Sequence, residues 1–290
     1  MPQHQPFTAL CSTLARVTRT SRADLHIHTT CSDGAYTPAE VVDLARRSGL
    51  AAVAITDHDT IAGIAPAQAA TRGPLEIVSG VEITAVFDGR GLHLLGYFFR
   101  SDNLALLSGL ARLRRQRAGR FREMVERLRA RGMSLQEEEV RAALEVGVPG
   151  RRTLAELLVR SGKVSSVRAA FASYLGDAGG VTIPSVGLPA GEAIALVRGA
   201  GGVAAWAHPS YDEETPRRLA ALRDLGLQAV EVDYPTCQGS KQRRLRALAA
   251  ELGLAVTGGS DCHGPGIVRR AIGACGVTAQ ELETIRRLAF

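Results

Sequence analysis

Six of the seven histidines lie where a short apolar run begins or ends, and most of them stand beside a carboxylate. The first run closes with His26 and His28, and because side chains on a strand alternate between its faces, both imidazoles point to the same side. Two imidazoles on the same face of a strand can coordinate one metal ion together. Seven further candidate donors lie at or near the other runs, namely Asp33, His58, Glu82, His93, His208, Asp261 and His263.

The nine candidate donors are imidazoles and carboxylates without a thiolate, a set that suits Mn²⁺, Fe²⁺ or Zn²⁺ and does not choose among them. Nine donors are too many for one ion, so we expect two or three divalent ions, with Glu82 long enough to bridge two of them. Such ions convert bound water to hydroxide near neutral pH and neutralise charge on a phosphoryl group. A single core histidine needs no metal, but six imidazoles and three carboxylates buried without one would be costly.

The length of 290 residues permits one large domain or one domain with an insertion. The 46% hydrophobic content excludes wholesale disorder, and no run reaches the roughly 18 apolar residues of a membrane span, so we expect a soluble protein without a membrane partner. Five cysteines form an odd set without a C-x-x-C pair, which argues against a disulfide framework and a thiolate zinc site. This cysteine usage predicts a reducing, cytoplasmic location.

The elements that must position the donors are visible as alternating runs. Seven runs rich in β-branched and apolar residues predict strands, at residues 23–29, 51–57, 75–85, 92–98, 203–209, 229–234 and 255–261. Amphipathic segments predict helices at residues 38–49, 190–201, 215–225 and 240–253. This alternation predicts an α/β fold with a parallel sheet or barrel, in which strand carboxyl ends converge on one mouth. Because His93 lies near the start of its run, we expect that strand to run against the others.

Residues 103–175 interrupt the alternation and are predicted to be helical for most of their length, with an apolar stripe that includes Leu113, Phe121 and Leu128. We therefore divide the chain into an alternating domain of residues 23–100 plus 177–290 and an all-helical insert of residues 101–176, which would cap the site. Residues 1–22 contain three arginines and no acidic residue, and we expect them to form a disordered basic extension.

The insert begins with a positive strip, because nine arginines and three acidic residues lie from Asp102 to Arg131. Such a strip attracts partners that carry phosphate. Arg114, Arg117 and Arg120 recur every three residues, which keeps their guanidinium groups roughly on one helix face. Paired guanidinium donors match phosphate oxygens, so these arginines are candidate substrate ligands. A solvated helix face is the alternative interpretation.

Six strings occur in order along the chain: DLHIHTTCSDG (24–34), ITDHDT (55–60), GVE (80–82), HLLG (93–96), AHP (207–209) and GSDCH (259–263). Together they resemble the polymerase and histidinol phosphatase (PHP) family, and more narrowly its 3′,5′-nucleotide bisphosphate phosphatase and 5′-3′ exoribonuclease branch. The resemblance runs from Ala23 to about Gly266, with the insert included. It implies a distorted (β/α)7 barrel of the PHP type that holds three metal ions.

The resemblance also implies how the donors are shared. The first ion and its attacking hydroxide would be held by His26, His28, Glu82 and Asp261. Glu82 would bridge to a second ion, completed by His93 and His208. A third ion would bind Asp33, His58 and His263. We take Mn²⁺ as the first choice of metal, with Fe²⁺ or Zn²⁺ as alternatives.

Three neighbouring carboxylates, those of Asp24, Asp57 and Asp59, are expected to orient imidazole N–H groups rather than bind metal. For Asp57, a cap at the end of its strand is an equally good interpretation. The resemblance adds one substrate residue, Arg151, which follows Gly150. The branch usually continues Gly-Arg-Pro-His, whereas this chain has Arg152 and Thr153 in the last two places. That difference leaves the base preference and the leaving-group acid open.

These observations predict a metal-dependent phosphoesterase that hydrolyses the 3′-phosphate of nucleoside 3′,5′-bisphosphates to the 5′-mononucleotide and phosphate, while the insert holds the 5′-phosphate. The same site would act as a 5′-3′ exoribonuclease on short 5′-phosphorylated RNA, because a 3′-phosphodiester presents the same phosphorus with one more substituent. The alternatives are a monoesterase like histidinol phosphatase, and a non-catalytic metal-binding module that binds nucleic acid. The sequence leaves the oligomeric state open.

Overall fold

The computed structural model describes residues 23–145, 148–176, 179–181, 183, 186–266 and 268–290. The basic extension predicted for residues 1–22 lies outside the described residues. Among the helices that the structure describes, none combines the length and the apolar character needed to cross a membrane.

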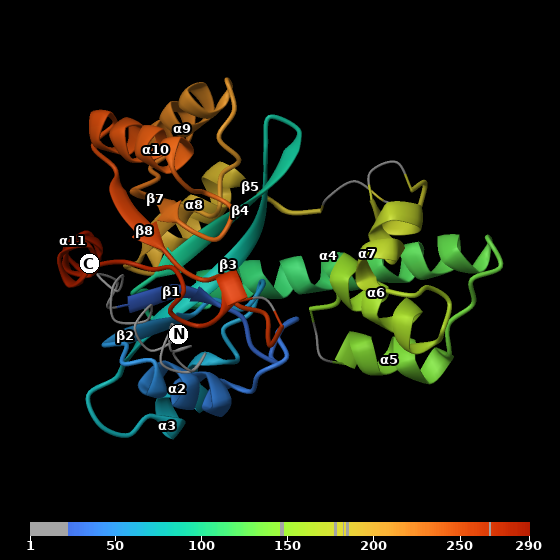
Figure 1. The fold of residues 1–290 in the computed structure, drawn as a ribbon. Coiled ribbons are helices and arrows are strands. Elements are labelled where there is room, and N and C mark those ends of the chain that lie inside the picture. The colour runs from blue at the N-terminus through green and yellow to red at the C-terminus, as the bar shows by residue number, and fades with distance from the viewer. Residues whose placement is uncertain (1–22, 146–147, 177–178, 182, 184–185, 267) are drawn as a thin grey trace, which may run out of the picture.

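One curled sheet forms the centre of the described chain (Figure 1). Its strands follow the spatial order β1-β2-β3-β4-β6-β7-β8, and the short β5 pairs with β3. The strands are β1 (Ala23–Ile27), β2 (Ala52–Ile55), β3 (Glu76–Phe87), β4 (Arg90–Tyr97), β5 (Leu188–Pro189), β6 (Val203–Trp206), β7 (Ala229–Asp233) and β8 (Ala255–Gly258). Each of the seven predicted runs overlaps one of the longer strands, although β3 ends two residues later and β4 begins two residues earlier than predicted, and β5 is additional.

The sheet is nearly closed into a barrel, because the chain after β8 returns to β1. The backbone N–H of His28 donates to the carbonyl of Cys262 at 2.9 Å. Gly259 permits this approach, since a Cβ atom there would lie 2.3 Å from the backbone nitrogen of His26. The strand that carries His93, β4, is antiparallel to both β3 and β6, as its position in the run predicted, and the other long strands pair in parallel. The predicted α/β barrel is confirmed.

Helices flank the barrel (Figure 1). They are α2 (Pro38–Arg47), α3 (Ile64–Ala70), α8 (Ala190–Gly199), α9 (Thr215–Asp224), α10 (Ser240–Glu251) and α11 (Ala279–Arg287), with the short η2 (Val268–Arg270) after β8. Alternate strand residues serve the two faces of the sheet. Along β2, Val53 and Ile55 join the apolar cluster that contains residues of α2 and α8, whereas Ala52 and Ala54 join a second cluster with residues of α11.

The described residues between β4 and β5 are mostly helical and form a lobe beside the barrel (Figure 1). It consists of α4 (Leu104–Arg129), α5 (Glu137–Glu145), α6 (Arg151–Arg160), α7 (Val167–Ala170) and the π-helical turn η1 (Phe171–Leu175). The long helix α4 belongs to two cores. Leu106 and Leu113 pack in the barrel cluster, while Phe121 and Leu128 pack with α6 in a separate apolar cluster. The arginines at 114, 117 and 120 therefore lie where the two cores meet.

Candidate metal centre and active site

The nine predicted donors converge at one end of the barrel, around the buried carboxylate of Glu82 in β3. Its Oε2 lies 3.5, 3.2 and 3.1 Å from imidazole nitrogens of His26, His28 and His58. Its Oε1 lies 2.9 and 3.0 Å from nitrogens of His93 and His208. Five imidazoles thus surround one carboxylate, with its two oxygens facing different rings, which suits a ligand shared between metal ions.

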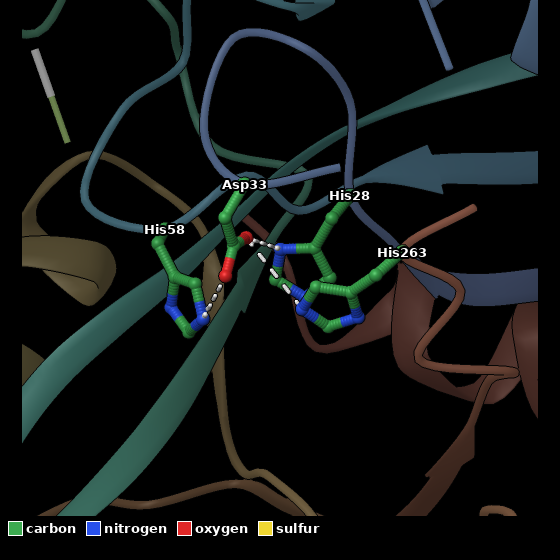
Figure 2. Close-up of side chains that lie close together, drawn as sticks. All are labelled: His28, Asp33, His58 and His263. Atoms are coloured by element: carbon green, nitrogen blue, oxygen red, sulfur yellow. Dashed lines mark ion pairs between the residues drawn. The ribbon is translucent and has the colours of Figure 1, made fainter. Parts of the chain in front are cut away.

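Asp33, in the loop after β1, gathers a second part of the cluster (Figure 2). Its Oδ1 lies 3.6 Å from His28 Nδ1 and 3.5 Å from His263 Nε2. Its Oδ2 lies 4.0 Å from His58 Nε2. These side chains follow β1, β2 and β8, three strands whose carboxyl ends the barrel brings together. The structure therefore places the predicted third set, Asp33, His58 and His263, side by side and adds His28 to it.

The other two predicted sets are also contiguous. Asp261, after β8, places Oδ1 3.5 Å from His26 Nε2 and 3.4 Å from His28 Nε2, which completes the set around Glu82 Oε2. On the opposite oxygen of Glu82, His93 Nδ1 and His208 Nε2 lie 3.4 Å apart.

Two rings lie between sets. His28 turns Nε2 to Glu82 and Nδ1 to Asp33, and His58 turns Nδ1 to Glu82 and Nε2 to Asp33. A neutral imidazole has a single free lone pair, so each of these rings can serve only one ion. His28 and His58 are therefore the positions at which neighbouring ions would compete for a ligand.

The cluster contains buried polar atoms that the protein itself does not satisfy. Four imidazole nitrogens, His26 Nε2, His28 Nδ1, His28 Nε2 and His58 Nδ1, are buried without a hydrogen-bond partner. Leaving such atoms unpaired is costly. Each of them lies within 4 Å of a carboxylate of the same cluster. Divalent ions that accept nitrogen and oxygen ligands would satisfy these nitrogens and neutralise the carboxylates, so the residues present fit a metal centre.

The electrostatics of the cluster favour a cation. Burial alone would raise the pKa of Glu82, but the imidazoles of His58, His93 and His26 hold it well below its usual value. Burial alone would lower the pKa of His28, but the adjacent carboxylates of Asp261 and Glu82 raise it to about 10. The carboxylates thus create a negative potential in which bound divalent ions would take the place of imidazole protons.

The carboxylates of Asp24 and Asp57 accept hydrogen bonds from loop residues and not from imidazoles. Asp57 accepts hydrogen bonds from the backbone N–H and the hydroxyl of Thr29, both at 2.7 Å, and from the hydroxyl of Ser32 at 2.5 Å. Asp24 accepts from the backbone N–H groups of Ser260 at 2.9 Å and Gly273 at 2.7 Å. The prediction that they orient imidazole N–H groups is therefore wrong, and the alternative of a strand-end cap describes Asp57. Each carboxylate instead fixes the backbone of a loop that carries donors.

Asp59 likewise contacts none of the imidazoles of the described residues, and it joins the barrel to the insert. It accepts from the backbone N–H of Thr84 at 2.7 Å and from its hydroxyl at 2.8 Å. It also accepts from Nη1 of Arg117 at 2.7 Å, so a residue of α4 is tied to the loop that carries His58. The expected imidazole contact of Asp59 is thus replaced by this ion pair.

The carboxylate that does orient an imidazole is Glu231 of β7, which the sequence analysis missed. Its Oε1 lies 3.0 Å from His26 Nδ1, which leaves His26 Nε2 directed at Glu82. Its Oε2 accepts from the backbone N–H of His208 at 2.7 Å. Glu231 is fully buried. One side chain therefore positions two donors, the role that partners of metal-bound histidines commonly have.

Two donors also carry backbone strain. His208 has φ 31° and Asp261 has φ 49°, both in the left-handed region that side chains other than glycine rarely adopt. His208 lies two residues after the end of β6 and Asp261 three residues after the end of β8, where the chain turns and directs the side chain into the cluster. Strain of this kind concentrates at functional sites and persists because the surrounding contacts enforce it.

A cavity of about 210 Å³ lies between the donor cluster and the insert. Its lining includes Asp33 and His58 from the barrel and Arg117, Arg120 and Arg151 from the insert. Burial, together with the nearby charges of Arg151 and Arg117, lowers the pKa of Arg120 to about 10. Three of the four predicted substrate arginines thus converge within range of mutual repulsion, which a bound anion would relieve.

The remaining predicted arginine, Arg114, does not line this cavity. Its guanidinium donates to the backbone carbonyl of Asp59 at 3.1 Å. Arg114 therefore supports the loop after β2, and the cluster that faces the cavity consists of Arg117, Arg120 and Arg151.

Known proteins resemble the chain over nearly all of its length. A family model described as the PHP domain matches residues 24–114. The chain is 34% identical over 256 residues to a 5′-3′ exoribonuclease of Haemophilus influenzae, which covers 85% of this chain and 91% of that relative. It is 33% identical over 258 residues to a 3′,5′-nucleoside bisphosphate phosphatase of Chromobacterium violaceum, with 86% and 90% covered. A solved structure from Bifidobacterium adolescentis, assigned as a metal-dependent phosphoesterase, matches with a TM-score of 0.84 and 33% identity, over 92% of this chain and 96% of that one.

Proposed function

This chain belongs to the PHP family, and we propose that it is a metal-dependent phosphoesterase that removes the 3′-phosphate of nucleoside 3′,5′-bisphosphates to give the 5′-mononucleotide and phosphate. One observation carries the proposal. Unsatisfied imidazole nitrogens surround Glu82 directly beside a cavity that three arginines line. A site that can hold divalent cations and a second anion at a fixed separation suits a substrate with two phosphates.

We assign the donors to ions as their contacts suggest. The first ion would be held by His26, His28, Glu82 and Asp261, the second by Glu82, His93 and His208, and the third by Asp33, His58 and His263. Mn²⁺ is the metal that we propose, and Fe²⁺ or Zn²⁺ would suit the same donors. When bound, such ions would lower the pKa of a water molecule and neutralise charge on the phosphoryl group.

The insert selects the substrate in this proposal. Arg117, Arg120 and Arg151 would bind the 5′-phosphate through paired N–H donors. Because Arg117 already donates through Nη1 to Asp59 and Thr84, its guanidinium is held in place before substrate arrives. A 5′-phosphate bound by these arginines would lie in the smaller cavity, and the 3′-phosphorus of the same nucleotide would then be placed at the donor cluster.

The same site would process short 5′-phosphorylated RNA from its 5′ end, since the phosphorus that is attacked is the same. A cytoplasmic location remains our prediction, because the four cysteines of the described residues, Cys31, Cys237, Cys262 and Cys275, are all free thiols.

A comparison of phosphomonoesters tests the proposal. Protein supplied with Mn²⁺ should release phosphate from adenosine 3′,5′-bisphosphate much faster than from histidinol phosphate. A reversed preference would favour the histidinol phosphatase alternative and defeat the nucleotide assignment. Stoichiometric metal binding without turnover of either substrate, or of 5′-labelled RNA, would instead support a non-catalytic module.

A further inference from the structure

A second and larger cavity opens beside His93 and His208, with a volume of about 600 Å³. Its walls are the hairpin between β3 and β4, the loop after β6, Arg151 of α6 and Arg218 of α9. Thr84 and Val86 contribute from β3, and they share a face with Glu82 because the side chains of a strand alternate. This cavity therefore continues along the strand that carries the central carboxylate.

The two cavities flank the donor cluster. Thr84, His93 and Arg151 line both of them, so they meet beside the metal donors. Beyond this junction the smaller cavity contains Arg117 and Arg120, and the larger one contains Arg90 and Arg218. A phosphoester at the donor cluster would thus have positively charged walls on both sides.

We propose that the larger cavity binds the downstream strand of an RNA substrate, with Arg90 and Arg218 contacting the phosphate that follows the cleaved one. This inference rests on the proposed function. Hydrolysis of a 3′,5′-bisphosphate places nothing beyond the 3′-phosphate, so it has no use for this space. An RNA substrate carries a further nucleotide on the same phosphorus, and a cavity of about 600 Å³ is large enough for such a group.

The chemistry balances without any further reactant. Water adds its oxygen to the phosphorus, the bond from phosphorus to the 3′-oxygen breaks, and the 3′-oxygen takes up a proton. The first nucleotide leaves with its 5′-phosphate and a 3′-hydroxyl. The downstream strand keeps the phosphate on its own 5′-oxygen, and it is therefore a 5′-phosphorylated substrate for another round.

The walls of the larger cavity suit a phosphate better than a base. Arg90 is exposed where the hairpin turns, and the side chain of Arg218 is 14% exposed and lies 3.5 Å from Asp212. An ion pair of 3.1 Å between Asp88 and Arg217 links the hairpin to α9, so the two elements that carry Arg90 and Arg218 lie next to each other. Trp206 lines the cavity but is only 5% exposed, and its ring therefore offers little face for a base to stack on.

A short substrate series tests this inference. It consists of adenosine 3′,5′-bisphosphate and the 5′-phosphorylated di- and trinucleotides of adenosine, of which only the trinucleotide has a phosphate beyond the cleaved one. Arg90→Ala and Arg218→Ala should each lower kcat/KM for the trinucleotide about five- to thirtyfold, and change it less than about twofold for the other two substrates. Arg243→Ala, an exposed arginine on α10, is the matched control and should leave all three values unchanged.

Higher salt should also weaken the trinucleotide reaction less in the two variants than in the parent protein, because one phosphate contact is missing. Arg90 is exposed, so Arg90→Ala tests the inference even if Arg218→Ala fails to fold.

Three outcomes would overturn the inference. If the two variants lose as much kcat/KM on the bisphosphate as on the trinucleotide, the first nucleotide itself lies in the larger cavity. If kcat/KM for the trinucleotide is unchanged in both variants, the two arginines do not contact its second phosphodiester. Parent protein that releases phosphate from the bisphosphate but cleaves neither oligonucleotide would overturn the inference while the proposed phosphatase stands. Inactivity on all three substrates would defeat both.

Discussion

The barrel and the helical insert bring opposite kinds of group to one site. The barrel supplies imidazoles and carboxylates at or near strand ends, and two of these imidazoles, His26 and His28, are fully buried. The insert supplies guanidinium groups from α4 and α6 that reach toward the barrel. The barrel donors suit cations, and the insert arginines suit anions.

The two regions also hold their groups differently. The loops that carry the donors are fixed by buried carboxylates that accept from backbone N–H groups, as Asp24 and Asp57 do. The insert is held at the site through side chains, with Arg117 bonded to Asp59 and Thr84. We infer that the barrel fixes the chemistry and that the insert decides which ester reaches it. Changes to the barrel donors around Glu82 should then affect every substrate, and changes to the insert arginines that line the smaller cavity only those substrates that carry a 5′-phosphate.

The largest effect should follow Glu82→Gln. The amide keeps the shape of the side chain but removes the charge that five imidazoles surround, so metal binding and turnover should fall together. We expect kcat/KM to fall about a thousandfold or more on every phosphoester, measured as phosphate release with Mn²⁺ present. The matched control is Glu76→Gln at the first residue of β3, where the carboxylate pairs with Arg286, and it should retain activity. Near-normal turnover by Glu82→Gln would show that the donor cluster around Glu82 is not required for hydrolysis.

Glu231→Gln should have a smaller and more selective effect. Because Glu231 positions His26 and the backbone of His208 without facing the substrate cavities, its loss should weaken metal affinity about 10- to 100-fold. Activity should return toward the parent value as Mn²⁺ is raised, in a metal titration monitored by phosphate release. A fall in kcat that saturating metal does not reverse would show that Glu231 does more than orient ligands.

Arg120→Ala should separate the two regions. Its guanidinium contacts the backbone carbonyl of Ile183 at 2.9 Å, so its removal leaves no buried carboxylate unpaired, unlike the removal of Arg117. We expect KM for adenosine 3′,5′-bisphosphate to rise roughly tenfold or more, with adenosine 3′-monophosphate unaffected because it lacks the 5′-phosphate. Equal losses on both nucleotides would contradict a 5′-phosphate clamp.

The smallest effect should follow Arg127→Ala on the same helix. Arg127 pairs at the surface with Glu123 at 2.7 Å, and such pairs contribute little. Kinetic constants for all nucleotides should stay within about twofold of the parent values, and stability should change by less than about 1 kcal/mol. A loss like that of Arg120→Ala would mean that the positive charge of α4 acts as a whole and not through the cavity arginines.

The sequence predicted most of the barrel because its signals are local. Apolar runs fix the strands, and the position of His93 at the start of its run indicated that β4 runs against its neighbours. The metal donors could be recognised in the sequence because six of the seven histidines lie where an apolar run begins or ends, which is an unusual distribution for this residue type. Glu231 gave no such signal, since a glutamate within the run AVEVD, with no histidine beside it, looks like an ordinary strand residue.

What could not be predicted depends on contacts between distant segments. Asp24, Asp57 and Asp59 lie within two residues of a histidine in sequence, yet their oxygens accept hydrogen bonds from the loops after β1 and β8, from β3 and from α4. Arg114 lies on the same helix face as Arg117, one step of three residues earlier. Only the packing of α4 on the barrel shows that its guanidinium donates to the backbone carbonyl of Asp59 and does not face the cavity. The helix α11 was not predicted, although its sequence carries a local signal: Thr278 and Glu281 form a capping box at its start.

We propose that the imidazoles and carboxylates from His26 to His263 hold the metal ions that perform the hydrolysis. Anomalous diffraction at the manganese edge, on crystals of manganese-saturated and active protein, tests it most directly. We expect anomalous peaks on both sides of the Glu82 carboxylate and beside Asp33. Crystals of active protein that show no peak in this cluster would contradict it.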